Sequence, residues 1–236
     1  MERYTKHVNF SYIGIKGQEK LLNSKVLIIG AGGLGTNFAS HFVRAGIGEV
    51  FIVDKDKVET TNLQRQWIYD ENDIGEYKAK AACLKLRKIN SEIKIDYSIM
   101  ELNVSNVNEV INGFDLVVDA TDNFKTRLMI NDFCHKNKIP WIFTGILDAE
   151  GQTMLIVPGQ TKNLRDVLNY NGKLDDADFN EIEPSITSSV LAPSVSIIAS
   201  MAVILSFKLL LDNYKDSLNK LFVFDTWRNR FKILDV

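Results

Sequence analysis

Apolar residues follow two alternating patterns along this chain. Short runs rich in β-branched residues predict buried strands, and these runs occupy residues 25–29, 49–53, 94–98, 114–118, 140–144 and 152–157. Apolar residues spaced three to four apart predict helices, and these occupy residues 33–45, 77–89 and 123–136. Strands that alternate with helices indicate βαβ units. The pattern therefore predicts an α/β fold with a mostly parallel, Rossmann-like sheet and helices on both faces.

The last third of the chain departs from this alternation. Residues 159–184 carry six acidic and three basic side chains and predict a long polar crossover loop. Residues 195–211 are strongly apolar and predict a helix buried in a core or a subunit interface. A membrane span is the alternative for this apolar segment, but serines interrupt it. Residues 221–234 alternate around a turn and predict antiparallel strands that extend the sheet. We expect one domain over residues 1–236.

Composition narrows the class of protein. Of the 236 residues, 45% are hydrophobic and 25% are charged, as in a globular protein. The formal net charge of −2 gives no general attraction to nucleic acid or to an anionic membrane, so neither is an expected partner. Two cysteines, Cys83 and Cys134, cannot form a secreted disulfide scaffold, and the first ten residues lack the apolar run of a signal peptide. The expected location is the cytoplasm.

A glycine-rich segment marks the first candidate site. Gly30, Gly32 and Gly35 form a GxGxxG motif between a predicted strand and a predicted helix, with Gly33 inside it. Such glycines allow a tight turn and a close approach of backbone N–H groups to phosphate oxygens. Asp54 ends the next strand, 19 residues after Gly35, where a carboxylate accepts hydrogen bonds from ribose hydroxyls. This arrangement predicts an adenine nucleotide, with ATP and NAD both open.

Polar residues that follow the other strands favour ATP. In a parallel sheet, ligands bind beyond the carboxyl ends of the strands, and the polar candidates there are Asp56, Asn62, Arg65, Gln66, Lys78, Asp119, Asp122 and Asn123. Arginine and lysine neutralise β- and γ-phosphates, and a carboxylate holds Mg²⁺. The set suits attack on an α-phosphate with pyrophosphate as the leaving group. Singly, Arg65 also suits a surface ion pair, Lys78 a solvated helix position and Asp122 a helix N-cap.

Two other functions remain open at this point. An NAD-dependent oxidoreductase would explain the glycines and Asp54 but would leave Asn62, Arg65, Lys78 and Asp122 without a role. A non-catalytic scaffold that binds a nucleotide or a partner protein would also use this fold, because a fold does not by itself confer activity.

Longer segments of the chain resemble the bacterial ubiquitin-activating-enzyme-like adenylyltransferases of the ThiF, MoeB and HesA type. The most specific segments are TNLQRQ at residues 61–66 and DATDNFKTR at residues 119–127. Arg3-Tyr4 near the N-terminus, VLIIGAGGLG at residues 26–35 and LFVFDTWRNRFKIL at residues 221–234 extend the resemblance over nearly the whole chain.

The resemblance implies an ATP- and Mg²⁺-dependent enzyme. It would adenylate the C-terminal carboxylate of a ubiquitin-like sulfur-carrier protein or of a ribosomal peptide and release pyrophosphate. Asp54 would bind the ribose and Asp122 the Mg²⁺, and the triphosphate would be held by Asn62, Arg65 and Lys78. The resemblance also implies a homodimer to which residues 1–24 contribute. In it a basic residue, here Lys6 in place of the family's arginine, would reach the partner's ATP.

Two departures from the family pattern concern cysteine. Family members often carry two CxxC pairs that bind Zn²⁺; this chain has neither pair, so no zinc site is expected. Many members also have a cysteine eight residues before a proline that matches Pro193, and Ser185 stands at that position. A serine is far less ionised than a cysteine and would not readily form a thioester or persulfide.

We predict that Ser185→Ala leaves the rate of adenylation within a few-fold of normal, because an acyl-adenylate is reactive enough to pass to a nucleophile without an enzyme thiol. ATP–pyrophosphate exchange measures the rate. A collapse of that rate in the variant would show that the serine takes part.

Overall fold

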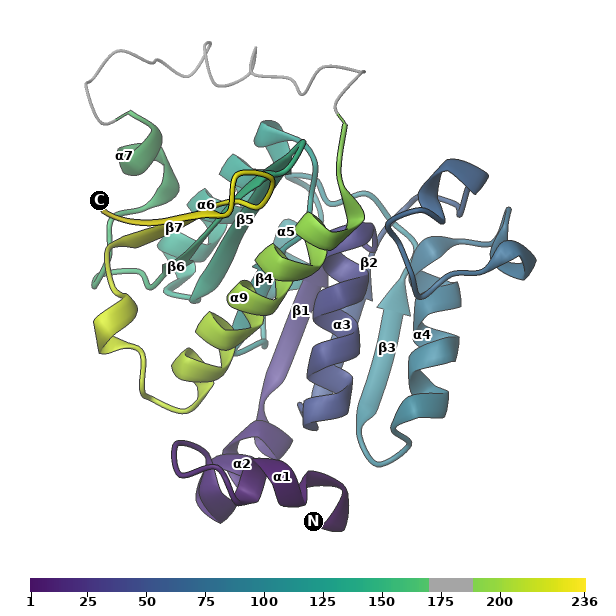
Figure 1. Cartoon of the computed structure of the whole chain (residues 1–236), viewed down its shortest axis with the longest axis horizontal. Coiled ribbons are helices and arrows are strands. Elements are labelled where there is room, and N and C mark those ends of the chain that lie inside the picture. Colours follow the sequence, from purple (N-terminus) through teal and green to yellow (C-terminus); the bar gives the residue numbers. More distant parts are fainter. Residues whose placement is uncertain (170–188) are drawn as a thin grey trace.

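An eight-stranded sheet forms the middle layer of the protein (Figure 1). The structure is a computed structural model that describes residues 1–169 and 189–236. The strand order is β3-β2-β1-β4-β5-β6-β7-β8, in which β1 to β5 are parallel and β6 to β8 are antiparallel to their neighbours. The strands are β1 (Lys25–Ile29), β2 (Glu49–Val53), β3 (Lys94–Ser98), β4 (Leu116–Asp119), β5 (Trp141–Leu147), β6 (Glu150–Ile156), β7 (Lys220–Asp225) and β8 (Arg230–Asp235).

Helices cover both faces of the sheet (Figure 1). One face carries α3 (Gly33–Ala45), α4 (Lys78–Ile89) and α9 (Ala192–Leu210), and the other carries α5 (Val107–Ile111) and α6 (Phe124–Asn137). The shorter helices are α1 (Thr5–Val8), α2 (Gly14–Asn23), α7 (Leu164–Leu168) and the 3-10 helices η1 (Glu2–Tyr4), η2 (Thr60–Asn62), η3 (Glu71–Asp73) and η4 (Lys215–Ser217).

The two hydrophobic cores follow from the alternation of side chains along the buried strands. In β1, Val26 and Ile28 face the core under α3, α4 and α9, whereas Leu27 and Ile29 face the core under α5 and α6. All four side chains are at most 3% exposed. The predicted fold class is confirmed: the sheet is mostly parallel, has helices on both faces and ends in antiparallel strands.

Most predicted elements appear at or near their expected positions. The helix over residues 33–45 and the strands over residues 25–29, 49–53 and 94–98 have the expected bounds. Helix α5 was not expected, because its five residues are too few for a clear helical period.

The predicted crossover loop at residues 159–184 needs a correction. Its first part contains α7, which begins at a capping box in which Asn163 accepts from the N–H of Asp166 at 3.1 Å. The second part of the crossover, and Ser185 with it, lies outside the described residues.

Helix α9 is long and apolar enough to cross a membrane by length and composition alone. Half of its most apolar window is buried inside the fold, where it packs against α3, β5 and β6. Ser194 and Ser206 lie on its buried side, and both side chains are hydrogen-bonded, to Thr226 and to the carbonyl of Ala202. The same length and composition are found in core helices.

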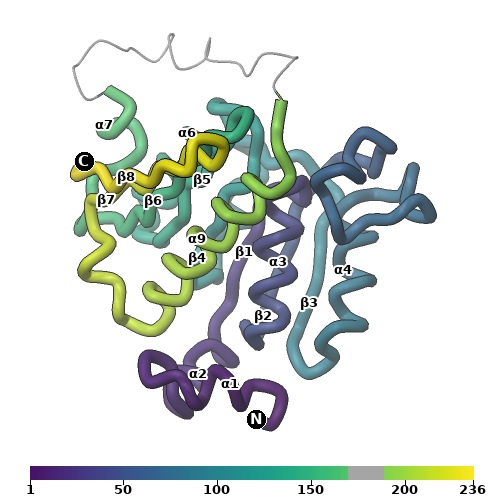
Figure 2. Tube along the Cα trace, viewed as in Figure 1, coloured from purple at the N-terminus to yellow at the C-terminus, as the bar shows by residue number. Residues whose placement is uncertain are grey.

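The N-terminal residues dock at the end of the sheet where the parallel strands begin (Figure 1 and Figure 2). Tyr4 is 2% exposed, and its hydroxyl accepts from the amide of Asn90, which follows α4, at 2.9 Å. The Tyr4 ring also packs on Gly46, where a Cβ atom would lie 2.5 Å from a ring carbon. Gly46 has a φ of +79° and ends α3.

We predict that Tyr4→Ala lowers the free energy of unfolding by about 3 kcal/mol, because it removes a buried aromatic side chain and leaves a cavity. Tyr12→Ala is the matched control: Tyr12 is 68% exposed, and we expect a change within about 0.5 kcal/mol. Urea denaturation of both variants measures the difference. Equal stabilities would contradict this docking of the N-terminal segment.

Candidate functional site

Three loops meet at the edge where the parallel strands end. Ile29, the last residue of β1, pairs with Val53 of β2 and with Asp119 of β4. The segments that begin at residues 30, 54 and 120 therefore leave the sheet side by side. Between β1 and β4 the strand order reverses direction, and such a switch point is where open α/β sheets bind ligands.

Two glycines of the first loop are required by the chain itself. Gly30 has a φ of +100°, and a Cβ atom there would lie 2.6 Å from the carbonyl oxygen of Ala120. At Gly35 a Cβ atom would lie 1.8 Å from the carbonyl oxygen of Gly30. At Gly33 it would lie 3.1 Å from Val195 of α9, so close packing of this helix accounts for that glycine.

Gly32 differs from these three because the space beside it is open. A Cβ atom at Gly32 would meet within 4 Å only the side-chain nitrogen of Gln66, at 3.7 Å. Gly32 is also the N-cap of α3, where backbone N–H groups and the helix dipole attract an anion. Gln66 is 3% exposed, and its side-chain oxygen has no hydrogen-bond partner among the described residues. An open glycine beside an unpartnered buried amide fits a polar ligand such as a phosphate group.

Asp54 is tied to the glycine loop. Its Oδ2 accepts from the N–H of Ala31 at 2.6 Å, and its Oδ1 accepts from the N–H of Asp56 at 2.7 Å. Burial raises the pKa of this carboxyl, and the two backbone hydrogen bonds and the charge of Lys78 oppose the rise. Each carboxylate oxygen keeps a second lone pair for a further donor, such as a ribose hydroxyl.

The two expected phosphate cations lie on either side of this loop. The Nζ of Lys78, the first residue of α4, is 3.1 Å from Asp56 Oδ2, and the lysine side chain is only 10% exposed. Arg65 donates to the carbonyl of Thr61 at 3.1 Å, and its Cγ would lie 3.6 Å from a Cβ at Gly33. Asn62 closes the capping box of η2 by accepting from the N–H of Glu59 at 3.1 Å.

Lys78 does not occupy a solvated helix position, because its ammonium group is paired with Asp56 and its side chain is largely buried.

Tyr69 is a site residue that the sequence pattern did not reveal. It is 5% exposed, and its hydroxyl lies 2.9 Å from the carbonyl of Ala31 and 3.0 Å from that of Lys78. It thereby connects the glycine loop to the start of α4. A single tyrosine without a repeated spacing carries no signal for such a role.

The two aspartates after β4 have different environments. Asp119 is fully buried, and its Oδ1 accepts from the N–H and hydroxyl of Thr121 at 2.9 and 2.6 Å. Asp119, one of the polar candidates from the sequence, is therefore bonded within the protein and has no exposed surface. Asp122 is exposed. The alternative role of Asp122 as a helix cap falls to Asn123, whose side-chain oxygen accepts from the N–H of Thr126 at 2.9 Å.

Asp122 shares its surroundings with the loop after β2. A hydrogen bond with Glu101 raises the pKa of Lys55, and the carboxylates of Asp56 and Asp122 add to the rise. Within residues 1–169 and 189–236, no group of three or more His, Cys, Asp or Glu side chains is placed to hold a metal ion. One exposed carboxylate beside a phosphate site fits Mg²⁺, which binds one or two carboxylates together with phosphate oxygens and water.

Lys6 is not part of this site within one chain. It lies on α1, next to Tyr4, which contacts Gly46 at the far end of α3. The glycine loop precedes the first residue of that 13-residue helix, so the length of α3, about 20 Å, separates the two regions. Among the other expected residues, Asp54 is bonded to Ala31, and Gln66 and Arg65 lie beside Gly32 and Gly33. Lys78 is connected to Ala31 through the hydroxyl of Tyr69.

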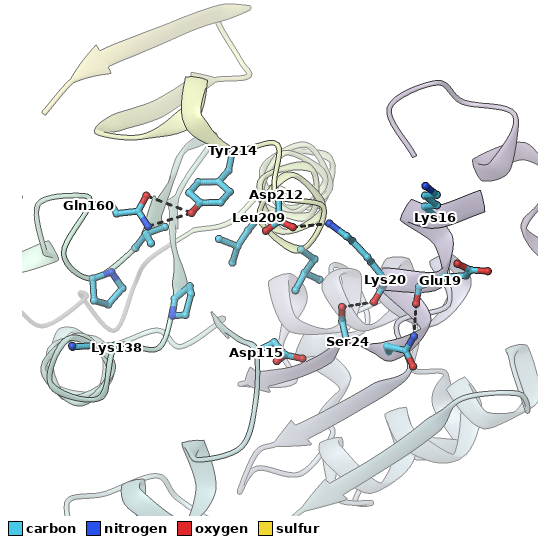
Figure 3. A pocket seen from close by; sticks show the side chains of 15 residues that line it. Lys16, Glu19, Lys20, Ser24, Asp115, Lys138, Gln160, Leu209, Asp212 and Tyr214 are labelled. Carbon is cyan, nitrogen blue, oxygen red and sulfur yellow. Dashed lines mark hydrogen bonds and ion pairs between the residues drawn. The ribbon is translucent and has the colours of Figure 1, made fainter. Parts of the chain in front are cut away.

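A cavity of about 700 Å³ opens at the opposite end of the sheet (Figure 3). Residues of α2, the segment before β4, residues 157–160 and the end of α9 line it. Four of its polar side chains form two pairs: Lys20 Nζ lies 2.6 Å from Asp212, and Gln160 is hydrogen-bonded to Tyr214 at 3.2 Å. This cavity is separate from the glycine loop.

Comparison with known proteins gives a consistent result. Residues 4–236 match the ThiF family. The "Sulfur carrier protein ThiS adenylyltransferase" of Bacillus subtilis is 38% identical over 232 residues, which are 96% of this chain and 66% of that protein. The "SAMP-activating enzyme E1" of Haloferax volcanii is 40% identical over 158 residues, which are 67% of this chain and 58% of that protein.

Solved structures of E. coli MccB share the fold. The structure with MccA-N7isoASN has a TM-score of 0.86 at 26% identity, and the structure with ATP has a TM-score of 0.82 at 25% identity. Each alignment covers 99% of this chain and 71% of the MccB chain. The chain spans about a third to two thirds of the length of the curated relatives that it matches. The resemblance stated from the sequence is confirmed.

We predict that two glycine variants change different properties of the protein, one its stability and the other its nucleotide binding. Gly35→Ala should lower the free energy of unfolding by more than about 2 kcal/mol, because its Cβ meets a backbone oxygen that cannot move independently. Gly32→Ala should leave stability within about 0.5 kcal/mol but weaken nucleotide binding about tenfold, because its Cβ occupies the path of the phosphates.

Thermal unfolding of both variants, with and without nucleotide, separates the two effects. Unchanged nucleotide binding in Gly32→Ala would contradict the assignment of the open side of this glycine to phosphate.

Proposed function

The chain belongs to the ThiF family, and from this premise we propose that it is an adenylyltransferase that uses Mg²⁺ and ATP. Its substrate is the C-terminal carboxylate of a ubiquitin-like sulfur-carrier protein or of a ribosomal peptide. The product is an acyl-adenylate, and pyrophosphate is released. The names of the B. subtilis relative and of the MccB structures with ATP and MccA-N7isoASN support this class of reaction.

One observation carries the proposal: two cationic side chains and an exposed carboxylate belong to the segments after β2 and β4, which leave the sheet beside the glycine loop. Arg65 and Lys78 provide two positive charges in the segment after β2, and Asp122 is exposed in the loop after β4. A dinucleotide with one pyrophosphate requires neither the extra cations nor a metal ligand. A triphosphate with Mg²⁺ uses all three residues.

The chemistry requires no proton transfer at the first step. An oxygen of the ionised carboxylate attacks the α-phosphorus and forms a new P–O bond. The bond from the α-phosphorus to the bridging oxygen breaks, and pyrophosphate leaves with its electron pair. Arg65 and Lys78 stabilise the charge that grows on the leaving group, and Asn62 and Gln66 orient the phosphates by hydrogen bonds. Asp122 would hold Mg²⁺, which would supply further charge neutralisation.

The other residues of the proposed site have binding roles. Asp54 accepts from the ribose, and the N–H groups of Gly33 and Leu34, the first two residues of α3, face the phosphates. Asp56 holds Lys78 in place, and Asn123 fixes the loop that carries Asp122. Gly35 permits the turn.

The proposed assembly is a homodimer in the cytoplasm. The distance between α1 and the glycine loop of the same chain supports a role of Lys6 in the partner's site, because Lys6 cannot reach its own. Residues 1–24 would then form part of the dimer contact. A lysine supplies the charge for this contact but not the bidentate geometry of an arginine.

A comparison of ligands by thermal unfolding tests the proposal against its alternatives. At 100 times its dissociation constant a ligand stabilises a protein by about 2.7 kcal/mol, which raises the Tm by about 5–10 °C for a chain of this size. We expect this rise with ATP and Mg²⁺ and none with NAD. A rise with NAD alone would support an oxidoreductase. ATP binding without pyrophosphate exchange, for any glycine-terminated carrier or peptide supplied, would support a non-catalytic scaffold.

We predict that Asp122→Ala abolishes ATP–pyrophosphate exchange, because the site loses its Mg²⁺ ligand. The Tm should change by no more than about 2 °C, since Asp122 is exposed. Glu109→Ala, which removes an exposed carboxylate on α5, is the control and should exchange normally. Normal exchange in Asp122→Ala would contradict the proposal.

A further inference from the structure

Arg127 is a charged residue in a place that usually holds an apolar one. It lies on α6 and is 8% exposed. Its guanidinium lies over the rings of Phe124 and Phe143, at 5.2 and 5.6 Å from the ring centroids. A buried charge is costly unless it is paired, and replacing such a pair by apolar residues often stabilises a protein. Stability alone therefore gives a weak reason for an arginine here.

The polar contacts of the Arg127 side chain reach the last residue of β4 and the loop after it. Its Nη2 donates to the carbonyl of Thr121 at 2.6 Å, and its Nε lies 3.2 Å from Asp119 Oδ2. The other oxygen of Asp119 accepts from Thr121. Arg127 thus fixes the backbone of residues 119–121 to α6 through both a carboxylate and a carbonyl oxygen.

Asp122 follows this fixed segment directly. On its other side, Asn123 is held by its hydrogen bond to the N–H of Thr126. Asp122 is therefore a single exposed residue between two anchored points. Metal ligands in proteins are oriented by hydrogen bonds of this kind in the surrounding shell, and loss of such partners lowers metal affinity.

We propose that Arg127 and Asp119 form a positioning pair that holds Asp122 toward the phosphates, which makes Arg127 a determinant of Mg²⁺ binding and not only of stability. The inference rests on the proposed function for the role of Asp122. Neither Arg127 nor Asp119 contacts the nucleotide. A lysine cannot replace Arg127, because one ammonium group on a flexible stem does not present the rigid fork that reaches both oxygens.

The test uses a double variant, Asp119→Asn with Arg127→Met, so that no unpaired charge stays buried. ATP in the presence of EDTA should raise its Tm as in the unmodified protein, because the glycine loop and Asp54 are intact. The Mg²⁺ concentration that gives half of the further Mg²⁺-dependent rise should increase about 10–100-fold. Arg127→Lys, a milder change, should shift this midpoint in the same direction.

The control is Arg165→Met, which removes another arginine–aspartate pair that involves α6. Arg165 lies on α7 and binds Asp132 of α6 at 2.8 Å, outside the loop after β4. In this variant, the Mg²⁺ concentration that gives half of the Mg²⁺-dependent rise in Tm should not change. An unchanged midpoint in both Arg127 variants would overturn the proposal. Loss of ATP binding in EDTA would also overturn it, because that loss indicates a general structural role.

ATP–pyrophosphate exchange separates this inference from the proposed function. If the unmodified protein exchanges, the variants should require more Mg²⁺ for the same rate. If it does not exchange with any carrier while the Mg²⁺ midpoint still shifts in the variants, the proposed function fails and the positioning role stands.

Discussion

The turn between β1 and α3 has no room for a side chain at Gly30 or at Gly35. Gly30 lies against the carbonyl of Ala120, and Gly35 lies against the carbonyl of Gly30. This crowding allows α3 to start directly above the end of β1 while the loop after β4 closes over the same point. The carboxylate of Asp54 then reaches the N–H of Ala31. Every candidate ligand contact at this edge depends on the position that this turn gives to the first N–H groups of α3.

The charges of the site are largely balanced before any ligand is bound. Lys78 is paired with Asp56, and Lys55 is paired with Glu101 at 2.9 Å. A triphosphate would therefore replace ion pairs that the protein already forms, and would not enter a site of unpaired cations. Such an exchange limits the desolvation cost of binding, because Lys78 is already buried. It also explains how a chain with a net charge of −2 supports a phosphate site.

The fold was predicted well where burial on both faces of a strand leaves a local pattern. Runs such as KVLII and EVFIV have only one favourable environment, a strand covered on both sides, and their bounds were predicted correctly. Helix α5 and helix α7 are too short for a helical period to be visible. They are stabilised instead by contact with the core around α6, to which Val107, Ile111 and Leu164 belong.

Some residues of the candidate site have a local signature in the sequence, and others do not. The glycine spacing, Asp54 and the cationic segment after β2 have a local signature, because a tight turn needs glycine and a phosphate needs positive charge. Asp119 and Asp122 are three residues apart and identical in type, so no pattern distinguishes the buried from the exposed one. Asp119 is the buried carboxylate, and it pairs with Arg127 of α6. Tyr69 belongs to the candidate site only because its hydroxyl contacts the carbonyls of Ala31 and Lys78.

The sequence by itself determined the alternation of strands and helices, the glycine turn that we assign to phosphate and the resemblance to the family. These follow from short-range periodicity and from residue types that suit one local geometry. Only the tertiary structure decided which carboxylate is exposed, which cation is paired and that the segment of Lys6 docks at the end of α3 away from the glycine loop, a helix length of about 20 Å. The physical reason is that burial and charge pairing depend on which residues the fold brings together across the sheet. The spacing of these residues along the chain does not specify those contacts.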